Sequence, residues 1–269
     1  MKCFSFRFVL IILAFGTLGC DAEKVDGPGT VRLSVRNLVG QDVVQYQETS
    51  VYQNNSNENF SFSKLKYVLS AIKLTGTQQI DSSEKALMVD EVKSTEAMFT
   101  LPFCFSSDAD DNAIFDVAVK NKTVFSKIEF VFGLSSDLNA SGYLAKNTAC
   151  SDMEWPTSEE GGYHYLKWEG SFAASGGSPD SAYKIHTGPT GSADYSSLVS
   201  LDADFTVDGD TWKIVLDTNF QKFFVSPESI SFAGLPSNVV VDTSIQTKIK
   251  SNVATMFSVG ALSKISSDY

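Results

Sequence analysis

The chain has 269 residues, of which 43% are hydrophobic, and a formal net charge of −11. Because a strongly acidic protein repels polyanions, this charge argues against nucleic acid as a partner. The apolar and aromatic content is ample for a packed core, and the length suits one large β domain.

Residues 1–20 have the three parts of a secretory signal. A basic start with Lys2 and Arg7 precedes an apolar run, and small residues follow before a cysteine. The apolar run is shorter than the roughly 20 residues that a membrane-spanning helix needs. The closing stretch Thr17 to Cys20 resembles the lipobox of bacterial lipoproteins. We therefore expect cleavage before Cys20, lipidation of its thiol, and a cell-envelope protein anchored in the periplasm or on the outer surface. Ordinary secretion is the alternative.

Two cysteines remain once Cys3 leaves with the signal and Cys20 carries the lipid. These are Cys104 and Cys150, and in an oxidising compartment such a pair most simply forms a disulfide. The alternative is a thiolate pair that holds a soft metal. Neither cysteine has a C-x-x-C or C-x-x-H partner to support that alternative.

Strand patterns dominate the rest of the chain. Residues 21–29 are short, polar and contain Gly and Pro, as expected of a tether to a domain at 30–269. Val31, Leu33 and Val35 then alternate with polar residues, the period of two of a half-buried strand. The other candidate strands are Leu65–Leu74, Ala86–Val92, Ile114–Val119, Phe125–Gly133, Tyr163–Phe172, Tyr183–Thr187, Leu198–Val207 and Trp212–Leu216.

Two helices are expected near the end of the chain. Asp217–Phe224 could form a short one, and Thr243–Phe257 places apolar residues at three- and four-residue steps. We expect this second helix to pack on a sheet, although its apolar face could instead meet a partner protein. Many short strands and few helices predict a mainly β fold, an antiparallel β-sandwich with a short C-terminal helix.

The chain contains only two histidines, His164 and His186, which limits the chemistry available. A serine or cysteine hydrolase needs a base beside its nucleophile, yet no G-x-S-x-G and no H-E-x-x-H occurs. The sequence therefore predicts a protein that is not an enzyme.

The two histidines fall on candidate neighbouring strands and could share one metal ion. Neutral imidazole suits copper, zinc or nickel, and a thioether such as that of Met153 would favour Cu(I). By alternation, His164 should lie on the same face as Leu166 and Trp168, and Glu169 on the opposite face. The other interpretation is that both histidines are hydrogen-bonded structural side chains.

Several motifs resemble those of the MbnP-like family over nearly the whole mature chain. The central ones are Met153-Glu154-Trp155-Pro156, the strand Gly161 to Gly170 that ends in Glu-Gly, and His186-Thr187-Gly188. The flanking ones are Phe60 to Ser70, Phe130 to Leu134, and Asn252 with Met256-Phe257.

The resemblance implies a periplasmic or surface copper-binding β-sandwich protein that acts with a di-haem partner related to MauG. In characterised members the partner oxidises a tryptophan to kynurenine, which binds copper together with histidines. Carried onto this chain, the resemblance makes His164 and His186 ligands and Trp155 the modified tryptophan, with Trp168 as an alternative. Many members have a second tryptophan where this chain has Thr157. Binding by the histidines alone, or no metal, thus remains open.

Two other interpretations of the sequence are a calcium loop and an adhesion module. The acidic run from Asp108 to Asn112 starts like a calcium loop, but Ala113 and Val119 replace the glycine and the bidentate glutamate, so we expect a solvated turn. A β-sandwich for adhesion or glycan contact, with structural histidines, is the rival function. It would expose aromatic platforms from Tyr163, Tyr165 or Tyr183 and keep the imidazoles apart.

Overall fold

The computed structural model describes residues 28–80, 91–98, 102–108, 113–150, 152–155, 161–190 and 193–265. The predicted signal, Cys20, nearly all of the tether, most of the predicted strand Ala86–Val92, and Thr157 lie outside these residues. No helix in the described ranges is long and apolar enough to cross a membrane.

The strands form two sheets. In the described part of the chain, the smaller sheet has the order β13 (Phe257–Ile265), β12 (Thr211–Asn219), β1 (Gly29–Val39) and β2 (Asp42–Val43), with β7 (Ala113–Val119) also on β1. The larger sheet has the order β10 (Ser181–Thr187), β9 (Leu166–Ala173), β4 (Asn59–Ile80), β8 (Thr123–Phe132) and β11 (Ser197–Val207). Strands β3 (Tyr52–Gln53), β5 (Glu91–Met98) and β6 (Phe103–Ser106) also pair with β4.

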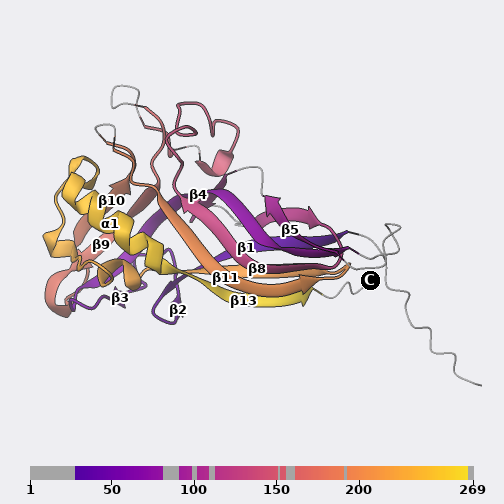
Figure 1. Ribbon diagram of the computed structural model, residues 1–269. Coiled ribbons are helices and arrows are strands. Elements are labelled where there is room, and N and C mark those ends of the chain that lie inside the picture. Colours follow the sequence, from indigo (N-terminus) through magenta and orange to yellow (C-terminus); the bar gives the residue numbers. More distant parts are fainter. Residues whose placement is uncertain are drawn as a thin grey trace, which may run out of the picture.

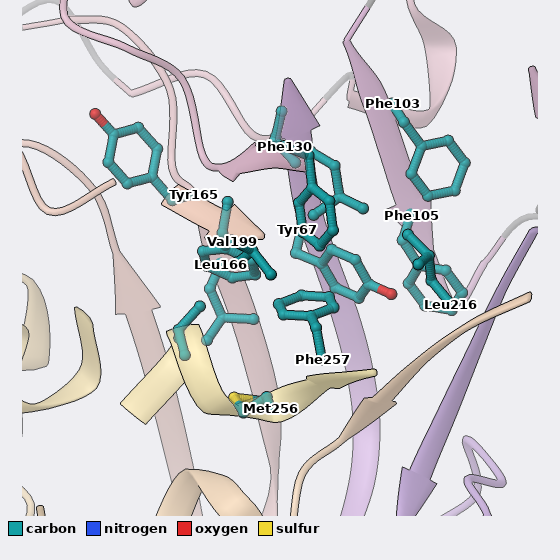
Figure 2. Packing of buried hydrophobic residues seen from close by; sticks show 14 of the residues in the cluster. Tyr67, Phe103, Phe105, Phe130, Tyr165, Leu166, Val199, Leu216, Met256 and Phe257 are labelled. Carbon is teal, nitrogen blue, oxygen red and sulfur yellow. The ribbon is translucent and has the colours of Figure 1, made fainter. Parts of the chain in front are cut away.

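Aromatic side chains fill the space between the sheets. Tyr67 of β4 stacks on Phe105 with ring centroids 5.0 Å apart, and Phe130 of β8 meets Phe257 edge-on at the same distance. Figure 2 shows these rings converging with Leu216 of the smaller sheet. The predicted mainly β sandwich with a short helix near the C-terminus is confirmed.

Helix α1 (Thr243–Met256) begins where the sequence predicts. The carboxylate of Asp242 caps it by accepting a hydrogen bond from the Ile245 amide at 3.0 Å. Ile249, Val253 and Met256 are buried, so its apolar face packs on the protein's own core, as expected.

Short 3₁₀ turns supply the remaining helical structure. They are η2 (Thr148–Cys150), η4 (Ala174–Gly176), η5 (Lys222–Phe224), η6 (Phe232–Gly234) and η7 (Val239–Val241). The predicted helix Asp217–Phe224 is wrong, because its first three residues complete β12 and only η5 is helical. Cross-strand pairing outweighs a weak local helical pattern at these positions.

The smaller sheet also departs from expectation in how its strands run. β1 and β12 are parallel, and β13, which was not predicted, follows α1 and returns antiparallel to β12. Thr30 pairs with Thr211 and Thr211 with Ile265, so β1 begins where β13 ends. Phe257 pairs with Thr218 at the other end of the same strands, where α1 stands. Figure 1 shows α1, β9 and β10 grouped opposite the C-terminus.

Cys104 and Cys150 form a disulfide, as predicted, with their Cα atoms 5.7 Å apart. The bond joins β6, which is paired with β4, to turn η2. It thereby fixes the chain just before Asp152, Met153 and Trp155.

Loss of this disulfide should lower stability substantially. The bond closes a loop with a sequence separation of 46, which corresponds to roughly 4 kcal/mol in the chain-entropy model. We expect the Cys104→Ser/Cys150→Ser variant to unfold at clearly lower urea concentration than the oxidised protein. Equal unfolding midpoints would contradict this expectation.

Candidate metal centre

The centre is built from two short antiparallel contacts at one end of the larger sheet. His186 lies on β10 and pairs with Lys167 of β9. His164 precedes β9, and its amide donates to the Met153 carbonyl at 2.7 Å, while the Trp155 amide donates to Gly162 at 2.8 Å. Because residues directly opposite in such a pair share a face, Met153 and His164 lie on the same side.

A bend at Tyr165 interrupts the strand between His164 and β9. Tyr165 and Leu166 are consecutive and both buried, so the alternation of sides is broken there. The prediction that His164 shares the face of Leu166 and Trp168 is therefore wrong, as is the placement of Glu169 on the opposite face. The bend turns His164 towards the side that carries Glu169 and His186.

As a result, the two imidazoles are neighbours. Their ring centroids are 5.2 Å apart and the planes are inclined by 65°. Two imidazoles bound to one tetrahedral ion, with metal–nitrogen bonds of about 2.0 Å, place their centroids roughly 5 Å apart. The spacing thus fits a shared ion.

The hydrogen bond of His186 defines which of its nitrogens is available. Nε2 lies 2.8 Å from the Glu169 carboxylate. A carboxylate accepts only, so it favours the tautomer with the proton on Nε2 and leaves the lone pair on Nδ1. This carboxylate–imidazole arrangement is the one that orients metal-ligating histidines.

His164 also presents a nitrogen without a partner. Its Nδ1 is buried and has no hydrogen-bond partner among the described residues. Burial, with help from the cationic Lys167 and from His186, lowers the pKa of His164 to about 2. Burial likewise lowers the pKa of His186. Both rings are therefore neutral near pH 7 and keep a lone pair for a metal.

Trp155 lies against the histidine pair. Its ring centroid is 4.5 Å from that of His164, and it is 5% exposed. Gly188 leaves room for the indole, because a Cβ there would sit 3.1 Å from the ring. The Gly188 amide in turn donates to the buried side-chain oxygen of Gln246 at 3.1 Å, which links this wall of the site to α1.

Trp168, the alternative tryptophan, lies elsewhere. It is fully buried in the sandwich, stacked on Phe62 at 5.0 Å and edge-on to Phe220 at 4.9 Å. Gly170, two residues later, has no space for a side chain, since a Cβ would lie 1.9 Å from the Ser61 carbonyl oxygen. Trp168 and Gly170 thus serve the core, whereas Trp155 and Gly188 form the centre.

The protein donors at the centre are few. In the described ranges, no group of three or more His, Cys, Asp or Glu side chains is arranged to hold a metal. Beyond the two imidazoles, the adjacent candidates are Met153, which is completely buried, and Trp155.

The resemblance seen in the motifs extends to a complete domain. The family model for MbnP matches residues 28–256, which is most of the chain. The chain belongs to the MbnP family. Among solved structures, MbnP from Methylosinus trichosporium is similar at 13% identity and a TM-score of 0.43, covering 89% of this chain and 99% of that one. No curated protein matches the chain.

The MbnP motifs of this chain converge in space. The Met-x-Trp segment, the histidine before β9 and the His-x-Gly of β10 meet at one place, although they are separate in sequence. Sequence reasoning missed the surrounding charges. Asp152 binds Lys64 and Lys66 of β4, and Lys167 donates to its carbonyl. The spacing of Lys64 and Lys66, which places both lysines on one face of a strand, could have indicated a shared acidic partner.

The lowered histidine pKa values predict acid sensitivity. In the unfolded chain the His164 imidazole binds a proton below about pH 6.5, whereas in the folded protein it stays neutral down to about pH 2. The contribution of His164 to the free energy of unfolding is therefore complete above pH 6.5 and falls as pH decreases towards 2. Between pH 8 and pH 5 we expect a loss of about 2 kcal/mol from this residue. Urea unfolding at both pH values should show it, and the His164→Phe variant should show a smaller loss. An identical loss in the variant would contradict the assignment.

Proposed function

We propose that this MbnP-family protein is a lipid-anchored, non-enzymatic copper-binding protein that captures or transfers copper outside the cytoplasm. One observation carries the proposal. His164 and His186 stand at the spacing of ligands of one ion, and each has a buried or oriented nitrogen left for it. The proposed anchor is supported by the stretch from Thr17 to Cys20, which resembles a lipobox.

The neutral, low-charge donors favour copper over harder ions. Imidazole together with the thioether of Met153 is a donor set that suits Cu(I), whereas calcium and magnesium need several oxygens. Of the acidic run from Asp108 to Asn112, the structure describes only Asp108, whose carboxylate pairs with Lys66 at 3.3 Å.

The two structural features that an adhesion or glycan-contact function requires are not observed at the predicted residues. Tyr163, Tyr165 and Tyr183 are each buried, at most 6% exposed, so they offer no platform for a sugar ring. The imidazoles are also adjacent and not apart.

A titration of the purified mature domain tests the proposal. Cu(I), supplied in competition with a coloured chelator, should be taken up to one ion per chain. Failure to withdraw copper from the chelator at any protein concentration would overturn the proposal. Uptake of several ions per chain would overturn it equally, because the geometry offers one imidazole pair.

Removal of Glu169 should weaken copper binding without removing it. Glu169→Ala frees His186 to rotate and to change tautomer, and the loss of such an outer partner typically costs 10- to 100-fold in metal affinity. Glu129→Ala is a matched control, since both carboxylates have similar exposure and Glu129 pairs with Lys73 instead. The prediction fails if the two variants bind copper alike.

For the tryptophan, we propose Trp155 as the residue that a MauG-like di-haem partner oxidises to kynurenine. Its contact with His164 would bring the new amine and carbonyl groups beside the histidine pair. Intact-mass and absorbance measurements on protein from its native host should show the conversion, with peptide mapping to Trp155. An unmodified Trp155 in copper-loaded native protein would leave the histidines, with Met153, as the ligands.

A further inference from the structure

The segment that carries Met153 and Trp155 is held in place by an unusual charge arrangement centred on Asp152. Its carboxylate accepts from Lys66 at 2.8 Å and also from Lys64, both on β4. The backbone carbonyl of the same residue accepts from Lys167 of β9. Three cations from two strands therefore converge on one residue.

This arrangement lies on the face of the sheet where the imidazoles stand. Lys167 pairs directly with His186 in the β9–β10 register and is half-buried. Lys66 is almost completely buried, with a side chain only 7% exposed. A buried ammonium needs a close carboxylate, and Asp152 is the closest one to Lys66, with the more exposed Asp108 at 3.3 Å. The lysines of β4 and β9 thus hold Asp152 in position on the sheet.

Among the described residues, the hydrogen bonds of the neighbours of Asp152 go to segments other than β4 and β9. Two residues before it, Cys150 is tied to β6 by the disulfide. Two residues after it, Glu154 bridges to Tyr163, and three residues after it the Trp155 amide donates to the Gly162 carbonyl. Both contacts are made to the segment that carries His164 and not to β4. Asp152 is therefore the residue whose ion pairs and hydrogen bonds join its own segment to β4 and β9, in addition to the burial of Met153 and Trp155.

We propose that Asp152 is a positioning residue, whose three lysine contacts hold Met153 and Trp155 against His164. The expected effect on copper affinity rests on the proposed function, whereas the positioning of Met153 and Trp155 does not. Without Asp152 the segment should stay tethered by the disulfide and yet lose its register over the imidazoles.

Hydrogen exchange of Asp152→Asn measures this directly in the metal-free protein. The amides of Trp155 and His164, which are bonded across the two segments, should exchange at least tenfold faster than in the wild type. Amides of β12 and β13 in the other sheet should be unchanged. Cu(I) affinity should fall 10- to 100-fold in parallel.

Two further variants separate positioning from a general loss of stability. Asp152→Asn/Lys66→Met also removes the buried ammonium, which in Asp152→Asn keeps only the more exposed Asp108 carboxylate as a partner, so global stability should recover while the fast exchange at Trp155 and His164 persists. Asp217→Asn is the matched control. It breaks the bidentate pair with Arg36 in the smaller sheet and should lower stability without changing exchange at Trp155 or His164.

The outcomes distinguish this inference from the proposed function. Exchange at Trp155 and His164 that equals the wild type in Asp152→Asn, or that returns to the wild-type rate with Lys66→Met, would overturn the positioning role. If the wild type binds no copper while Asp152→Asn still shows the local exchange effect, the positioning role is supported and the copper function alone is refuted.

Discussion

Replacing His164 and His186 together with alanine is expected to abolish specific copper binding, a loss of at least about a thousandfold in affinity. Each imidazole contributes one of few donors, and these are the only histidines in the chain. With the paired nitrogens gone, Met153 and Trp155 present no group of comparable basicity to the ion.

The single variants should reveal how the two ligands differ. His164→Ala opens a cavity beside Trp155, so its binding defect should come with some loss of stability. His186 has a side chain 24% exposed, and its replacement should reduce affinity with little change in unfolding. Chelator competition and urea unfolding on the same samples check both statements. Tight one-to-one binding by the double variant would end the copper assignment to this centre.

Trp168→Ala should be among the most destabilising single substitutions in the protein, at roughly 3–5 kcal/mol. The indole contacts aromatic rings of four segments, including Phe62, Phe220 and Phe232. Because typical domains are stable by only about 5–15 kcal/mol, such a loss is a large share of the total. Thermal and urea unfolding should both show it.

Two other tryptophan variants show whether Trp168 serves stability or copper binding. Trp212→Ala, a partly buried tryptophan at the edge of the core that contacts Phe205, should cost clearly less. Trp155→Ala should alter copper binding more than Trp168→Ala does in the folded protein. If Trp168→Ala left stability intact and removed copper binding, the assignment of the two tryptophans would have to be exchanged.

The sequence predicted most of the fold because its strands obey simple patterns. The burial of β11 alternates for most of its length, and α1 buries the residues that its three- and four-residue spacing indicates. β13 escaped prediction because most of it is exposed and only Phe257 is buried. The parallel pairing of β1 with β12 joins residues about 180 positions apart, which no local pattern can indicate.

The motifs identified the residues of the candidate centre, but strict strand alternation gave the wrong face for His164. The motifs placed Met153, Trp155, His164 and His186 together, and the geometry agrees. Strict alternation, however, would have put His164 on the face of Trp168. The bend at Tyr165 is a tertiary effect, because its ring packs against Gly133, which has a positive φ of 97° and no room for a side chain. Such a contact between distant segments leaves no periodic trace in the sequence.

The direction of β1 has a consequence for a domain held at a membrane. β1 starts beside the end of β13, and its 11 residues run roughly 35 Å towards the end where α1 and Gly188 meet. If Cys20 carries the lipid, the bilayer lies beyond the start of β1. The imidazole pair, next to Gly188 and α1, then lies towards the end of the domain that faces away from the bilayer.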